Sequence, residues 1–252
     1  MEVHSHTHTP RKKWTHYLWE FLMLFLAVFC GFLAENFREH QVEKERGKKY
    51  IESFYEDLKA DTGRMSYYTD FDDAKLTVLG NLNNCYDTVS KNRSTTSCLL
   101  EIIKISALNR PFKITERTLN QLSNAGGFRL LQNADADSII AYQNDFNNFQ
   151  DFQLTVFQQA QDNVRNTFDL LINFNANVQM FKPQGRRIVI NFDSKEITNP
   201  LLFSNDAGLL NKYFNELQLY YRVTYNHKWR LLDLKDSQIR LIDYFKNKYH
   251  FE

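Results

Sequence analysis

The sequence predicts an all-α protein in which one N-terminal transmembrane helix continues into an antiparallel helical bundle. Only eight glycines and four prolines occur in the 252 residues, which leaves few turn formers and favours long helices. An uncharged apolar run lies near the start, and apolar residues recur every three or four positions over most of the remainder. We therefore expect a short polar tail at residues 1–16, a transmembrane helix at 17–34 and a helical-bundle domain at 35–252.

The apolar run, Phe21–Ala34, contains no charged residue, and extending it back to Tyr17 gives 18 residues in which only Glu20 is charged. At about 1.5 Å per residue this helix is roughly 27 Å long, enough to cross the hydrocarbon core of a bilayer. Its N-terminal flank carries basic and aromatic side chains typical of a membrane interface: Arg11, Lys12, Lys13, Trp14 and Trp19.

Two alternatives to an uncleaved anchor stay open. A cleaved signal peptide also combines a basic start with an apolar core, but no small-x-small cleavage site follows the run. Lipoprotein processing at Cys30 is disfavoured because Val28 and Phe29 precede it where small residues are needed. The other alternative is a buried helix of a soluble protein.

The orientation of the anchor is predicted from its basic flanks. The cluster at 11–13, beside a very short tail, favours a cytoplasmic N-terminus and a large domain outside the cytoplasm. Basic residues between Arg38 and Lys49, counted alone, predict the opposite. They are interleaved with glutamates, and the rule weakens where a long domain follows.

The bundle is expected to contain four long helices, at 35–61, 65–89, 137–174 and 206–249. Asp61-Thr62-Gly63 is the expected turn between the first two, and short helices are expected at 98–107 and 115–124. An alternating, β-branched segment near 186–192 favours one short strand or an extended loop. Steps of three and four residues along the third helix are typical of bundle or coiled-coil packing. Seven residues are expected in the core: Phe149, Val156, Val164, Leu171, Leu217, Leu234 and Leu241.

Cys85 and Cys98 flank a polar stretch that we interpret as the loop of a helical hairpin, so their thiols could form a disulfide. Such a bond would fit an oxidising space outside the cytoplasm. The alternative is a pair of half-buried free thiols, because sequence alone does not show that the Cα atoms come close enough. Cys30 lies within the apolar run, where it serves as a small apolar residue.

Two other groups of residues are candidate sites. His4, His6 and His8 alternate in the tail, with His16 nearby, and imidazoles at this spacing can bind Zn²⁺, Ni²⁺ or Cu²⁺. The alternative is a solvated tail that tolerates histidine. Glu20, one turn inside the apolar run, either reaches the headgroups or pairs with a polar group on a neighbouring membrane helix.

Other patterns are interpreted as structural. The acidic run Asp70–Asp73 lacks the glycine and terminal glutamate of a calcium loop and is expected to be a solvated face. Gly126-Gly127 lacks the following Lys-Ser/Thr of a phosphate loop and is expected to end a helix. Neither His227 nor His250 has a nucleophile or carboxylate at the spacing of a known motif, so no catalytic residue and no cofactor are expected. The net charge of +1 argues against a nucleic-acid partner.

The anchor and the charged helix that follows it carry a family resemblance. The relevant segments are Glu20-Phe21 through Ala34-Glu35-Asn36, the run 45–61, the block 118–131 and Ile139–Tyr142. In these the chain resembles a family of single-pass membrane proteins of unknown function, common in Bacteroidetes-type bacteria. The resemblance implies an anchored helical domain and an inner-membrane location, with the C-terminal domain in the periplasm; it implies no activity. The histidine-bearing tail departs from the pattern of the family.

Together these observations favour a non-catalytic, membrane-anchored scaffold or sensor-like module that binds a protein or a ligand, or that forms a homo-oligomer. Two alternatives stay open. One is a metal-handling protein that uses its histidine tail, and the other is an enzyme whose site is assembled from residues distant in sequence.

Overall fold

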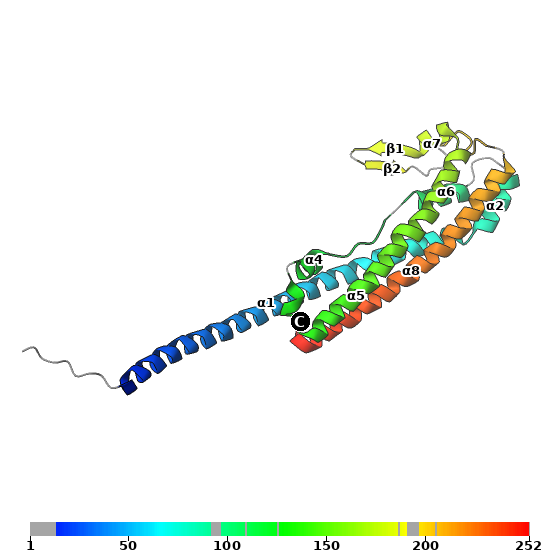
Figure 1. Ribbon diagram of the computed structural model, residues 1–252. Coiled ribbons are helices and arrows are strands. Elements are labelled where there is room, and N and C mark those ends of the chain that lie inside the picture. Colours follow the sequence, from blue (N-terminus) through cyan, green and yellow to red (C-terminus); the bar gives the residue numbers. More distant parts are fainter. Residues whose placement is uncertain are drawn as a thin grey trace, which may run out of the picture.

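The structure is a computed structural model that describes residues 14–91, 97–108, 110–124, 126–185, 187–190, 197–204 and 206–251. The expected all-α fold is confirmed, because a long N-terminal helix packs against a helical bundle (Figure 1). Three long rods dominate the described residues. They are α1 (Trp14–Leu79), a rod built from α5 (Asn133–Phe152), the π-helical turn η2 (Gln153–Phe157) and α6 (Gln158–Leu171), and α8 (Ala207–Tyr249).

Side-chain contacts fix the directions of the rods. Phe54 of α1 contacts Tyr142 of α5 and Phe245 of α8, with ring centroids 6.1 and 6.3 Å apart. About five turns further along α1, Asp72 meets His227 of α8, whose ring stacks on Phe157 of η2 at 4.4 Å. Residue numbers therefore rise together along α1 and α5–α6 and fall along α8, so α8 is antiparallel to the other two rods.

The expected turn at Asp61-Thr62-Gly63 is wrong, and the first two predicted helices are one continuous helix that ends at Leu79. Asp61 does not cap a helix, because its carboxylate accepts hydrogen bonds from the backbone N–H and hydroxyl of Thr115, both at 2.7 Å. The hydroxyl of Thr62 donates to the Leu58 carbonyl at 2.8 Å, within the same helix. The chain turns instead at Gly80-Asn81, so the described bundle has three long rods in place of four.

Shorter elements fill the space between the rods. Helices α2 (Leu82–Lys91) and α3 (Ser97–Ala107) lie at the end of the bundle far from the N-terminus. An extended linker, described at residues 108 and 110–116, then returns beside the rods: Leu108 lies level with Gln161, Phe112 with Gln153, and Thr115 with Asp61. Helices α4 (Arg117–Asn124) and η1 (Gly127–Leu130) close the other end.

The single strand or loop expected near 186–192 is a hairpin where the structure describes it. Strands β1 (Phe181–Gln184) and β2 (Arg187–Ile190) pair antiparallel after the short helix α7 (Phe174–Met180). Gly185 between them has φ +60°, a conformation that glycine adopts without steric cost. Residues 186, 191 and 192 lie outside the described residues. The sequence pattern did not indicate β1 because this segment contains Pro183, and proline is uncommon within β-strands since it lacks the N–H that strand pairing uses.

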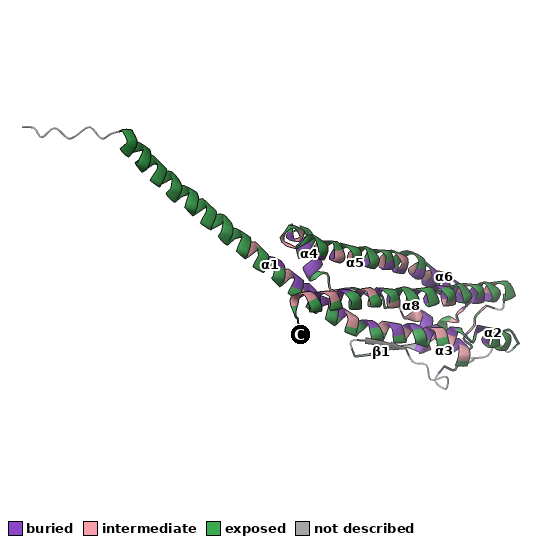
Figure 2. Ribbon diagram, turned by 90° about the horizontal axis from the view of Figure 1, so that it is seen from below, coloured by how far each residue is buried: buried purple, intermediate pink, exposed green. Residues whose placement is uncertain are grey.

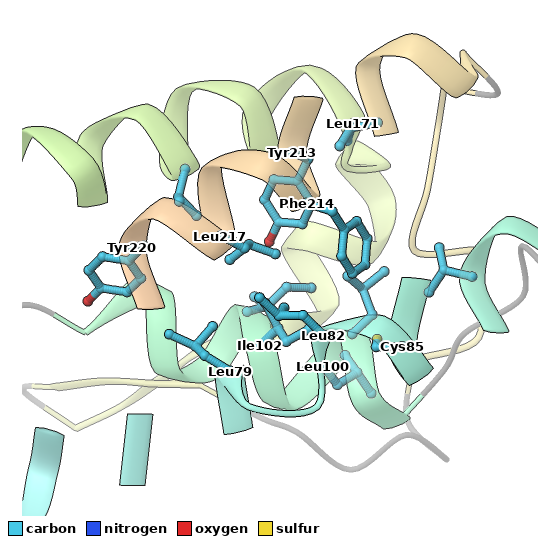
Figure 3. Close-up of a cluster of buried hydrophobic side chains, with 14 of the residues drawn as sticks. Leu79, Leu82, Cys85, Leu100, Ile102, Leu171, Tyr213, Phe214, Leu217 and Tyr220 are labelled. Carbon is cyan, nitrogen blue, oxygen red and sulfur yellow. The ribbon is translucent and has the colours of Figure 1, made fainter. Parts of the chain in front are cut away.

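The core consists of two apolar clusters (Figure 3 shows part of the distal one). The distal cluster lies around Leu79, Phe157 and Leu217, and the proximal cluster lies around Phe54, Phe149 and Leu234. Six of the seven expected core residues are buried. The prediction for Val156 is wrong, because this residue is 45% exposed. The π-helical turn adds a residue at this level and rotates Val156 outward, and Gln153 and Phe157 point inward in its place.

The N-terminal part of α1 projects from the bundle, and its residues 14–41 are exposed (Figure 2). Among the described residues, α1 is the one helix long and apolar enough to cross a membrane, judged by length and composition. None of the residues in its apolar window is buried. The helix enters the bundle at Gly47, which is buried beside the backbone of Leu130.

Gly47 and Gly63, both on α1, form a matched pair for substitution. We expect Gly47→Ala to lower the free energy of unfolding by about 1–3 kcal/mol, because its Cβ would overlap the Leu130 carbonyl and force η1 to move. A Cβ on Gly63 would meet no neighbouring atom within 4 Å, so Gly63→Ala should raise stability by about 0.5–1 kcal/mol through helix propensity. Urea unfolding of both variants checks this, and equal effects would contradict the close approach at Gly47.

Candidate functional site

A layer of polar side chains separates the two apolar clusters. It consists of Asp72 and Lys75 on α1, Gln153 in η2 and His227 on α8, and none of the four is more than 3% exposed. The helical repeat places them there: Asp72 follows Leu58 and Met65 and precedes Leu79 at seven-residue steps, so it occupies a core position of α1. We call these four residues the polar layer.

Hydrogen bonds of the polar layer join four segments of the chain. His227 Nδ1 lies 2.6 Å from Oδ2 of Asp72, and its Nε2 lies 3.2 Å from Oε1 of Gln153. The same Oε1 accepts the backbone N–H of Phe112 at 2.8 Å, and Nε2 of Gln153 donates to the Phe112 carbonyl at 3.1 Å. The network therefore ties α1, α8 and the π-helical turn to the linker at 108–116.

Lys75 is the buried cation of the layer. Its Nζ lies 3.9 Å from Oδ1 of Asp72 and over three ring faces, at 4.5 Å from Phe71, 4.8 Å from Phe157 and 5.6 Å from Tyr220. Burial lowers the pKa of Lys75 to about 8, and attraction to the Asp72 carboxylate opposes this shift. The ring faces replace part of the lost hydration of the ammonium group.

Two buried hydroxyls adjoin the layer on α8. The hydroxyl of Tyr220 interacts with that of Thr224, four positions further along the same helix. Burial raises the pKa of Tyr220 above its ordinary value, so this phenol stays protonated at any physiological pH.

The polar layer lies inside the bundle, behind a surface groove. This groove, of about 400 Å³, runs between α5 and α8 and is lined by charged residues that include Asp145, Arg230 and Asp233. Phe149 forms part of its wall and separates it from His227, with ring centroids 5.2 Å apart. Chemically, the layer offers an acid–base pair, an amide and an ammonium group, an arrangement that can hold and move a proton between helices.

A second set of buried carboxylates fixes the end of the bundle where α1 enters. Asp135, at the start of α5, accepts hydrogen bonds from Tyr244 (2.8 Å), Lys248 (2.5 Å) and Tyr249 (2.6 Å) near the C-terminus of α8. Asp57 of α1 accepts from Arg117 and Thr118 of α4, at 2.9 and 2.5 Å. These contacts hold the last turns of α8 against the start of α5, and they hold α4 against α1.

The sequence-predicted sites have different places in the structure. His4, His6 and His8 lie outside the described residues, and no group of three or more His, Cys, Asp or Glu side chains suited to a metal ion occurs in the described part of the chain. Glu20 lies on the exposed part of α1, where its Oε1 is 3.3 Å from Nε2 of His16 one turn earlier. Glu20 therefore has a partner on its own helix.

The structure joins Cys85 of α2 to Cys98 of α3 through a disulfide, with Cα atoms 5.7 Å apart. The bond crosses the short helical hairpin that the sequence indicated, and both residues pack with the distal cluster. Cys30 is the free, exposed cysteine of the described residues.

For the disulfide we expect alkylation of the unreduced, denatured protein to label one thiol, that of Cys30. After reduction all three cysteines of the chain should be labelled. Mass spectrometry of peptides containing Cys85 and Cys98 measures this directly. Labelling of all three without reductant would show that the bond does not form.

One interpretation of the polar residues needs correction, and a contact of His227 adds to another. The run Asp70–Asp73 is not wholly a solvated face, because Asp72 is 2% exposed within it, whereas Asp73 forms an exposed ion pair with Lys228 at 2.6 Å. His227 does have a carboxylate partner, Asp72, 155 positions away. The seven-residue steps through Asp72 could have revealed its burial, but no sequence signal pairs it with His227.

Comparison of the chain with protein-family models, with curated proteins and with solved structures finds no match.

Proposed function

We propose that the protein is a single-pass membrane-anchored helical scaffold or sensor-like module, non-catalytic, that acts by binding a protein or ligand. One observation carries the proposal: α1 is a single unbroken helix from Trp14 to Leu79. Its N-terminal part exposes an apolar run, and its C-terminal part supplies core residues and half of the polar layer. Any force on the exposed part is therefore transmitted to the bundle core through one helix.

The orientation in the proposal follows from the basic cluster at 11–13, with the N-terminus in the cytoplasm and residues 35–252 in the periplasm of a bacterial inner membrane. The disulfide between Cys85 and Cys98 is consistent with that oxidising compartment. The family resemblance supports the same location.

The far end of the bundle is suited to meeting a partner. α8 has 43 residues, so at about 1.5 Å per residue it holds this end roughly 65 Å from the end at which α1 enters. Several large apolar side chains are exposed there around the junction of α6 with α7, where the Phe203 N–H donates to the Leu171 carbonyl at 2.8 Å. They are Leu170, Phe174, Val178 and Phe203, which are 57–77% exposed. Clustered exposed apolar side chains are typical of protein-contact surfaces.

The anchoring part of the proposal is tested with the full chain in its host. The protein should stay in the membrane pellet after an alkaline wash, and a reporter that is active only outside the cytoplasm should be active when fused after Glu252. Activity of a cytoplasm-dependent reporter at that position would reverse the orientation. Release of the protein from the pellet by the alkaline wash would contradict the proposed membrane anchor.

The binding part is tested by affinity capture from mild-detergent membranes. We expect a protein partner, or a second copy of the chain, to be captured by the wild type and lost in the double variant Phe174→Ser, Phe203→Ser. The control is Leu154→Ser, which replaces another exposed apolar side chain (54%) away from this end. If the double variant still captures the partner, the contact surface lies elsewhere on the protein. Enzyme activity of the purified chain itself would contradict a non-catalytic role.

A further inference from the structure

A groove lined by carboxamide side chains lies between α2 and the start of α8, at the end of the bundle far from the N-terminus. Its volume is about 330 Å³, within the range of small-molecule sites. Four carboxamides line it: Asn83 on α2, and Asn211, Asn215 and Gln218 on α8. None of the described residues that line the groove is charged, although 24% of the residues in the chain are charged. We call this feature the amide groove.

The helical repeat of α8 places its three carboxamides in one row. Asn211, Asn215 and Gln218 are separated by steps of four and three residues, so they share one face of the helix. At about 1.5 Å per residue the row is about 10 Å long, which is the length of a disaccharide. The charged residues between them, Lys212 and Glu216, pair with each other at 3.8 Å and do not line the groove.

The four carboxamides are available to a ligand. All four residues are exposed, and none of their side chains forms a hydrogen bond with another described residue. Each carboxamide carries two N–H donors and an acceptor oxygen, so it can pair with two neighbouring hydroxyl groups at once. A hydroxyl group both donates and accepts, so it matches a carboxamide in either orientation. A charged ligand, in contrast, would find no counterion among the described residues that line this groove.

Aromatic side chains form the floor of the groove. Phe214 of α8 is 7% exposed, and the partly buried ring of Tyr86 on α2 packs edge-to-face with it, with centroids 5.1 Å apart. Leu82, which also lines the groove, belongs with Phe214 to the distal cluster (Figure 3). A sugar ring presents C–H groups on its faces and hydroxyl groups around its edge. Its faces therefore suit the aromatic floor, and its edge suits the carboxamides.

The disulfide holds the α2 wall of the groove in place. Cys85, which precedes Tyr86, is 2% exposed and is bonded to Cys98 of α3. A helix of ten residues, such as α2, is marginal in isolation, so this bond and the packing of Leu82 fix its position. A wall that is fixed before binding loses little conformational entropy when a ligand arrives.

We propose that the amide groove binds an uncharged saccharide, with a ring face on the aromatic floor and its hydroxyl groups on the carboxamides. The groove is lined by other residues than the exposed apolar side chains assigned above to a protein partner. The proposal does not depend on the orientation of the anchor. The saccharide experiment and the capture experiment can therefore fail independently of each other.

Saturation-transfer-difference NMR tests the proposal on the full-length protein, in micelles of a detergent that has no sugar headgroup. The probes are maltose, cellobiose and N,N′-diacetylchitobiose, which are uncharged disaccharides that differ in linkage and in substituents. Each is used at about 10 mM, so that a Kd as weak as about 1 mM is detected. We expect saturation transfer to the ring protons of at least one of them. A capped tetra-alanine peptide, which offers backbone amides but no sugar ring, should show no transfer.

The variant Asn215→Asp locates the site. It keeps the shape of the side chain, removes both N–H donors and adds a negative charge, so the Kd of the disaccharide should rise at least about tenfold. The matched control is Asn148→Asp, which changes an exposed asparagine on the charged groove between α5 and α8 and should leave the Kd unchanged. Both residues are exposed, so both variants should keep the unfolding midpoint of the wild type.

Three outcomes would overturn the proposal. One is the absence of transfer to all three disaccharides. Another is an equal effect of Asn215→Asp and Asn148→Asp on the Kd, which would place the contact outside the amide groove. The third is transfer to the capped peptide in place of the disaccharides, which would make the groove a peptide site.

Discussion

Leu171→Ala is expected to lower the free energy of unfolding by about 2–5 kcal/mol. Leu171 is 1% exposed in the distal cluster, at the last residue of α6. Its surroundings cannot easily collapse into the cavity, because its own carbonyl holds Phe203 at 2.8 Å and the next residue, Ile172, bridges to Leu202. The cost should therefore include the cavity as well as the lost burial of the side chain.

The control for this prediction is Val156→Ala on the same rod. Val156 is 45% exposed, so its truncation should change stability by less than about 0.5 kcal/mol. Denaturant unfolding followed by circular dichroism measures both variants. A loss below about 1 kcal/mol for Leu171→Ala, or equal losses for the two, would contradict the packing assigned to α6.

The contrast between these residues shows what apolar spacing can predict. Steps of three and four residues correctly identified Phe149, Val164 and Leu171 as core residues, because an unbroken α-helix repeats its buried face at that interval. The same steps fail at Val156, where the π-helical turn adds a residue. The residue types in the π-helical turn do not indicate its presence. The inward position that the turn creates is occupied by glutamine, which the search for apolar spacing does not count.

The continuity of α1 was missed for a different reason. Asp61, Thr62 and Gly63 are residues that favour turns and caps, and the local pattern predicts a break. In the folded chain, Thr115 supplies the donors that the Asp61 carboxylate needs, from 54 positions away. Tertiary hydrogen bonds of this kind override local preference, and local sequence does not contain them.

The polar layer was only partly predictable. The seven-residue steps Leu58–Met65–Asp72–Leu79 place Asp72 in the core, and His227 fits the same kind of spacing between Thr224 and Leu231. The spacing within one helix does not show which residues of α1 and α8 lie side by side. That depends on where each rod begins and on the chain between them. The bond between the Gln153 side chain and the Phe112 backbone depends on a main-chain position, which has no side-chain signal.

Lys75→Met should stabilise the protein at pH 7 by about 1–3 kcal/mol. The substitution removes a buried ammonium group and keeps an unbranched side chain that can contact Phe71, Phe157 and Tyr220. Asp72 keeps its 2.6 Å contact with His227, so the substitution does not leave an isolated buried carboxylate. The control Lys59→Met replaces an exposed lysine of α1, paired with Glu56, and should change stability by less than about 0.5 kcal/mol.

The pH dependence of the two proteins identifies the cause. Because burial lowers the pKa of Lys75 to about 8, the native protein releases this proton at a lower pH than the unfolded chain, whose lysine titrates near 10.5. Between these values the unfolded chain binds more protons, so wild-type stability should rise with pH, by at most roughly 3 kcal/mol, and Lys75→Met should lack this rise. The advantage of the variant over the wild type should therefore shrink above pH 8, as urea unfolding at several pH values will show. An advantage that stays constant would mean that Lys75 is not the titrating group.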